Sequence, residues 1–121
     1  MLRRSFLYLA GFGLVFAARA VSAHAYLARA TPAVGSTVDA APKEIRIWFT
    51  GAIEPVFSTI DVKDAAGKSV TQGKAEPDPA DQTVLHVALG PLAPGTYTVT
   101  WHVTSVDTHK TEGSFEFHLA G

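Results

Sequence analysis

Short runs in which apolar and polar residues alternate fill most of the chain after residue 25. An alternation with a period of two is typical of strands that bury one face, because successive side chains of a strand point to opposite sides. Three such runs are clear, at residues 44–50, 83–89 and 95–104, and a fourth ends the chain. The positions in phase are Ile45, Ile47, Phe49, Leu85, Val87, Leu89, Tyr97, Val99, Trp101, Val103, Phe115, Phe117 and Leu119.

Further strands are predicted around residues 26–31 and at Ile60 and Val62, and nothing after residue 23 resembles a long amphipathic helix. Residues 64–67 predict a hairpin loop in which Gly67 takes a positive φ. Residues 75–81 are predicted to form a polar connection, because their prolines are unsuited to a central strand. About seven strands result, which indicates an all-β, seven-stranded immunoglobulin-like Greek-key β-sandwich.

Two aromatic residues of the run 95–104 carry a more specific prediction. Tyr97 follows a Pro- and Gly-rich crossing and fits a tyrosine corner, in which its hydroxyl bonds to the upstream backbone. Trp101 shares its phase and is expected in the core. The alternative is that both form a sugar-stacking platform, but their phase with Val99 and Val103 favours burial.

Residues 1–23 have the layout of a secretory signal peptide: two arginines, a short apolar run, and small residues ending at Ala23. The apolar run is shorter than the ~20 residues of a membrane-spanning helix, so we expect residues 1–23 to be removed and not to act as an anchor. The mature domain, residues 24–121, is therefore not expected to be embedded in a membrane. Arg3 and Arg4 partly match a twin-arginine signal, which leaves twin-arginine and general export open. Cleavage is predicted after Ala23, with a second acceptable site at residues 18–20. The expected location is the periplasm.

Removing residues 1–23 also removes three arginines, so seven basic and eleven acidic residues remain and the formal charge changes from −1 to −4. A mildly acidic domain argues against a nucleic-acid partner. The sequence contains no cysteine, which excludes disulfides, thiolate metal sites and thiol nucleophiles.

Asp107 and His109 form the first candidate site, because they lie two residues apart in the loop between the last two predicted strands. The alternative is a polar turn in which the Asp caps backbone amides. His102 and His118 share faces with polar residues and are expected to face solvent, and His86 is expected to be structural.

His24 becomes the first residue if cleavage follows Ala23, and its α-amine and imidazole can then chelate one ion. With the His109 imidazole and the Asp107 carboxylate they give three nitrogens and one oxygen, a set that suits tetragonal Cu(II). Zinc is the alternative ion. Asp107 either binds the ion or accepts a hydrogen bond beside it, and Glu54 and Glu112 are candidate auxiliary groups that are expected to be solvated.

The chain resembles the periplasmic copper-resistance proteins of the CopC type over most of residues 24–121. The resemblance is carried by His24 after the signal, by residues 47–50 and 94–97, and most specifically by the last block. That block comprises Val103, Ser105, Asp107, His109, Gly113, Phe115 and Phe117.

The resemblance implies a sandwich that binds Cu(II) through His24, Asp107 and His109. It also implies a role in copper resistance or supply, often beside a membrane copper transporter of the CopD type. Two departures are visible. Met1 is the only methionine, so no thioether Cu(I) site is expected, and Thr108 and Lys110 stand where the family usually has Gly and Pro.

We therefore expect an exported, monomeric Cu(II)-binding protein that sequesters or delivers copper and is not an enzyme. One alternative is a small copper oxidative enzyme of the polysaccharide monooxygenase kind, although residues 24–121 contain no long insertion for a substrate platform. The other is an immunoglobulin-like interaction module without metal.

Overall fold

The structure, a computed structural model, describes residues 24–121, and the predicted signal peptide lies outside these residues. Strands and one short 3₁₀ turn, η2 (Pro55–Phe57), make up the regular structure of the described part. The strands are β1 (Leu27–Thr31), β2 (Thr37–Val38), β3 (Glu44–Phe49), β4 (Thr59–Lys63), β5 (Thr71–Asp78), β6 (Asp81–Leu89), β7 (Gly95–Thr104) and β8 (Lys110–Leu119). No helix within residues 24–121 is long and apolar enough to cross a membrane.

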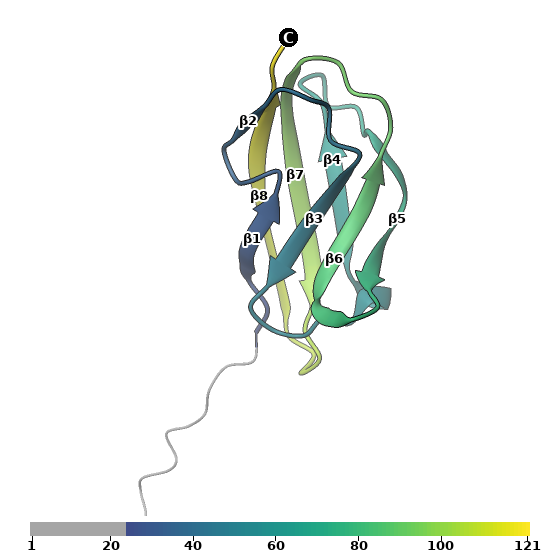
Figure 1. The fold of residues 1–121 in the computed structure, drawn as a ribbon. Helices are drawn as coiled ribbons and strands as arrows, with labels where there is room; N and C mark the ends of the chain where they lie inside the picture. Colours follow the sequence, from purple (N-terminus) through teal and green to yellow (C-terminus); the bar gives the residue numbers. More distant parts are fainter. Residues whose placement is uncertain (1–23) are drawn as a thin grey trace, which may run out of the picture.

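The strands form two four-stranded sheets that pack face to face (Figure 1). One sheet has the order β1-β3-β6-β5 and the other β2-β8-β7-β4. All neighbours are antiparallel except β2 and β8. The predicted all-β sandwich is thus confirmed, and β7 and β8, whose connecting loop holds Asp107 and His109, form the longest hairpin.

The core lies between the sheets and is built from the positions predicted by phase. All thirteen in-phase apolar residues named above are buried. Tyr97 donates its hydroxyl hydrogen to the Ala93 carbonyl, which confirms the tyrosine corner. Tyr97 and Trp101 are only 4% and 5% exposed, which rules out the sugar-stacking alternative. Trp101 instead meets Phe49 edge-on, with ring centroids 5.3 Å apart.

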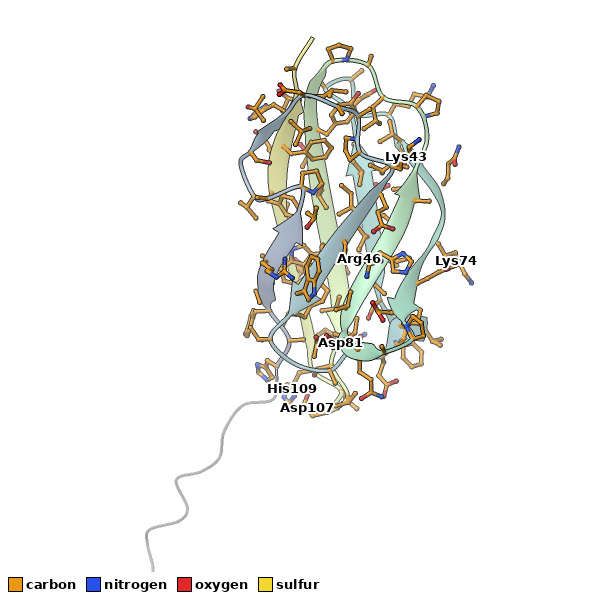
Figure 2. The ribbon with its side chains drawn as sticks, viewed as in Figure 1. Lys43, Arg46, Lys74, Asp81, Asp107 and His109 are labelled. Carbon is orange, nitrogen blue, oxygen red and sulfur yellow. The ribbon has the colours of Figure 1, made fainter. Side chains whose placement is uncertain are left out.

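The prediction that residues 75–81 form a polar connection is wrong for most of this stretch. Most of this stretch belongs to the edge strand β5, which pairs with β6, and only the turn between these two strands is a connection. Pro77 is tolerated because an edge strand need not donate every backbone hydrogen bond. Arg46 of β3 lies near the middle of the same sheet (Figure 2). Its Nη1 donates to Asp78 Oδ2 at 3.0 Å. This contact ties the end of β5 to the centre of the sheet.

Two smaller features complete the fold. The two-residue strand β2 carries no usable alternation. With β5 it brings the number of strands within residues 24–121 to eight, where about seven were predicted. Gly67 has a φ of +84° in the hairpin loop between β4 and the following segment, as predicted. The segment that leads into β1 and the β7–β8 loop lie at the same end of the sandwich, opposite the carboxyl terminus (Figure 1).

Candidate metal centre

The loop between β7 and β8 is tight and closes on its own backbone. Ser105 N donates to His109 O at 2.9 Å, and Thr108 N donates to Ser105 O at 2.8 Å. Thr108 has a φ of +72°, a left-handed conformation that is unusual for a β-branched residue. This conformation turns the chain sharply between Asp107 and His109, so both side chains lie at the tip of the hairpin (Figure 2).

Asp107 is held within this loop by several donors. The hydroxyl of Ser105, which is completely buried, donates to Asp107 Oδ1. His109 Nδ1 lies 3.2 Å from Asp107 Oδ2, and His109 N donates to Oδ1 at 3.4 Å. The Ser105 hydroxyl, followed by the His109 contacts, lowers the pKa of Asp107 below its ordinary value against an opposing effect of desolvation. Asp107 is therefore an ionised, oriented carboxylate at neutral pH.

Two threonine hydroxyls fix the amino-terminal segment at the same end of the sandwich. Thr50, just after β3, accepts from Tyr26 N at 2.9 Å and donates to His24 O at 3.2 Å. Thr50 N also donates to Tyr26 O at 2.7 Å. Thr111 of β8 donates its hydroxyl hydrogen to Ala25 O, and Ala25 is fully buried. The residues that follow His24 are thus bonded to both sheets.

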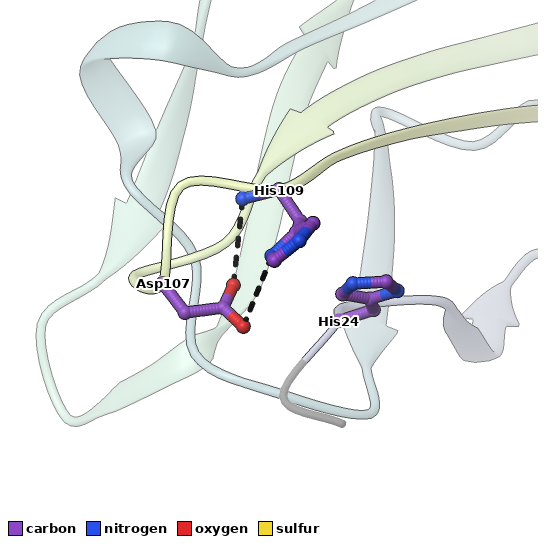
Figure 3. A group of neighbouring side chains, drawn as sticks. All are labelled: His24, Asp107 and His109. Carbon is purple, nitrogen blue, oxygen red and sulfur yellow. Dashed lines mark hydrogen bonds and ion pairs between the residues drawn. The ribbon is translucent and has the colours of Figure 1, made fainter. Parts of the chain in front are cut away.

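This anchoring brings the three predicted ligands together (Figure 3). The rings of His24 and His109 have centroids 4.0 Å apart, inclined at 46°. One potential ligand atom from each of His24, Asp107 and His109 can be chosen so that all lie within 4.8 Å of one another. Donors bound to one ion at about 2.1 Å lie at most ~4.2 Å apart. Rotation of the side chains about their torsions would therefore be needed to bring the three atoms onto one metal ion.

The centre is open to solvent on one side. The side chain of His109 is 58% exposed and that of Asp107 32%, while His24 is half-buried. The hydroxyl of Tyr26 lies 3.5 Å from His24 Nδ1. Tyr26 and Val106, which neighbour the ligands along the chain, are also exposed. An ion, or a protein that exchanges one, can therefore reach the centre without the sandwich opening.

The remaining histidines lie away from this centre, and each contacts a nearby polar side chain. The pairs are His86 Nδ1 with Glu44 Oε1 at 3.6 Å, His102 Nε2 with Glu112 Oε1 at 3.0 Å, and His118 Nδ1 with Thr96 Oγ1 at 2.9 Å. His102 is exposed as predicted, whereas His118 is half-buried by its neighbours. Glu54 and Glu112 are exposed and lie outside the three-residue group found in the described part of the chain.

The sequence did not reveal the residues that hold the ligands. Thr50 and Thr111 have no local signal, because their partners lie 26 and 86 residues away in the chain. Ser105 has a weak local sequence signal, since a Ser two residues before an Asp can donate a hydrogen bond to its carboxylate. The resemblance to the CopC type includes Ser105 but implies no role for it.

The chain matches one family model and is similar to several known proteins. The CopC domain model matches residues 27–120. Protein YobA of Escherichia coli K12 is 40% identical over 100 residues, covering 82% of this chain and 81% of YobA. Copper resistance protein C of Pseudomonas syringae pv. tomato is 33% identical over 127 residues, covering 97% and 96%. The crystal structure of CopC from Methylosinus trichosporium OB3b is 34% identical, with a TM-score of 0.76 and coverage of 80% and 94%.

Proposed function

The chain belongs to the CopC domain family, and from that premise we propose that it is an exported protein that holds one Cu(II) ion outside the cytoplasm. In this proposal, residues 1–23 are removed and the ion is bound by the new α-amine and imidazole of His24, with His109 and Asp107. The observation that carries the proposal is the convergence of these three side chains within 4.8 Å, from segments more than 80 residues apart.

The chemistry of the donor set supports copper. Two imidazoles and an amine are nitrogen ligands, and copper lies at the top of the divalent affinity series for such sites. The Asp107 carboxylate, whose pKa is lowered mainly by the Ser105 hydroxyl, adds a negative charge that offsets part of the charge of the ion. The described residues contain no methionine or cysteine, which gives the site no soft ligand for Cu(I). The ion is cargo, and no reaction is assigned to the protein.

Copper resistance or homeostasis in the periplasm is the proposed role, through sequestration or delivery by a monomer. The Pseudomonas relative is a copper resistance protein, which supports a carrier over an enzyme. A membrane copper transporter of the CopD type is the proposed partner. The exposure of His109, Tyr26 and Val106 around the centre supports direct contact with such a protein.

Titration calorimetry of protein that begins at His24 tests this function. We expect one tight Cu(II) site per chain, and a loss of at least tenfold in affinity for His109→Ala. Extending the terminus by a single Gly should weaken binding comparably, because it removes the α-amine from the chelate. His86→Ala is the matched control and should bind as the unmodified protein does. Equal affinity of the Gly-extended and unextended proteins would refute ligation by the amine.

A further inference from the structure

We infer that Thr50 and Thr111 are positioning residues of the metal centre: their hydroxyls hold the amino-terminal segment so that His24 lies against His109 before any ion binds. Neither residue is a ligand in the proposed function, on which the consequence for copper affinity rests. The placement of His24 itself does not depend on that function and can be measured without metal.

Thr111 connects the two halves of the centre directly. It lies two residues after His109 on β8, and its hydroxyl donates to Ala25 O, one residue after His24. One hydrogen bond therefore links the strand that directly follows one imidazole to the segment that carries the other. Because β8 is paired with β7 along its whole length, this side of the bond is rigid. The freedom of the terminal segment is thus limited at Ala25.

Thr50 limits the same segment from the opposite sheet. Its hydroxyl donates to His24 O and accepts from Tyr26 N, which fixes the peptide groups on both sides of Ala25. Ala25 is 0% exposed, so its methyl group packs into the core and leaves little room for the segment to shift. The backbone of three successive residues, from His24 to Tyr26, is consequently held by these contacts.

A chain terminus without such anchors is ordinarily mobile. If a hydroxyl is removed, part of the entropy cost of ordering His24 moves from folding to copper binding. A hydrogen bond of ordinary net strength corresponds to about a fivefold to tenfold change in an equilibrium constant. We therefore expect the Cu(II) dissociation constant to rise about fivefold to tenfold for Thr111→Val and for Thr50→Val.

The first measurement uses metal-free protein that begins at His24 and detects NMR cross-relaxation between the rings of His24 and His109. Ring centroids 4.0 Å apart predict a strong signal. It should be lost or much weakened in Thr111→Val and Thr50→Val and retained in Thr111→Ser, which keeps the hydroxyl. Absence of the signal from the unmodified protein, or its full retention in both Val variants, would overturn the inference whatever the copper affinity.

The second measurement is a double-mutant cycle on Cu(II) affinity, with chelator competition as the assay. Thr111→Val is combined with the single-Gly extension, which by itself removes the amine from the site. If Thr111 acts through His24, its effect should shrink to less than twofold in the extended protein. An undiminished effect would show that Thr111 acts elsewhere and would contradict the inference.

The two arms separate this inference from the proposed function. Failure of the unmodified protein to bind Cu(II), with the ring signal present and sensitive to both threonines, would refute the function alone. Thermal unfolding of each metal-free variant checks that the sandwich is intact. Thr50 is exposed, so Thr50→Val still tests the inference should Thr111→Val fail to fold.

Discussion

Thr108 provides a test of the loop geometry that does not require copper. Its φ of +72° lies in the left-handed region, where an L side chain costs about 1–2 kcal/mol. Gly avoids this cost but loses about 0.5–1 kcal/mol through the greater freedom of its unfolded chain. The difference predicts that Thr108→Gly is more stable than Thr108→Ala by about 0.5–1 kcal/mol.

Comparing Gly with Ala removes a complication. The hydroxyl of Thr108 donates to the Asp107 carbonyl, and both variants lack that hydroxyl equally. Thr108 is exposed, so burial of the methyl group contributes little. For a domain of this size, the free-energy difference corresponds to about 2–8 °C in melting temperature. Thermal unfolding of the metal-free proteins by circular dichroism can resolve this difference.

Lys110 supplies the matched control, because it is also exposed but begins the strand β8. Within a strand Ala is more stable than Gly, so the melting temperature of Lys110→Gly should be lower than that of Lys110→Ala. A Thr108→Ala protein that melts at or above the temperature of Thr108→Gly would contradict the left-handed conformation. The loop between Asp107 and His109 would then have a different shape from that described above.

Three other predictions concern the loop, the core and the site. Ser105→Ala should raise the pKa of Asp107, because the Ser105 hydroxyl is the largest cause of its lowering. In the unmodified protein the folded-state pKa of Asp107 lies below the unfolded value, so the ionised carboxylate stabilises the fold above pH ~3.9. That stabilisation is lost as the pH falls through the lowered pKa. Carboxyl carbon-13 NMR titration measures the change, and an unchanged pKa would show that another group is responsible. Gly113→Ala should lower the free energy of unfolding by about 1–3 kcal/mol, because the added Cβ would lie 2.6 Å from Trp101 Cζ2; urea unfolding equal to that of the unmodified protein would contradict this packing. Cu(II) affinity should fall steadily as pH is lowered from about 7.5 to about 5, because imidazole and amine nitrogens bind metal only when deprotonated, and a flat affinity over that range would exclude nitrogen ligation.

The core of this fold could be predicted because its strands alternate strictly. Ile45, Ile47 and Phe49 show the period of two, and their burial follows from it. Strand β5 escaped prediction because its burial pattern carries no alternation and Pro77 suggested a connection. The sequence cannot distinguish an edge strand of this composition from a polar loop, since pairing with β6 decides between them.

The three residues of the candidate site were named from the sequence, whereas the residues that hold them in place were not. Asp107 and His109 stand out locally, and the link to His24 came from a cleavage signal and a family resemblance. The hydroxyls of Thr50 and Thr111 meet the terminal segment only after the strands have paired. Such contacts depend on register between distant strands, which no local pattern encodes.

Electron paramagnetic resonance of the Cu(II) protein tests the central claim most directly. One equivalent of Cu(II) bound to protein that begins at His24 should give an axial spectrum with hyperfine coupling to three nitrogens. The single-Gly extension should change that spectrum, because one of the three nitrogens is the α-amine. Identical spectra for the two proteins would contradict the claim that processing at His24 creates the copper site.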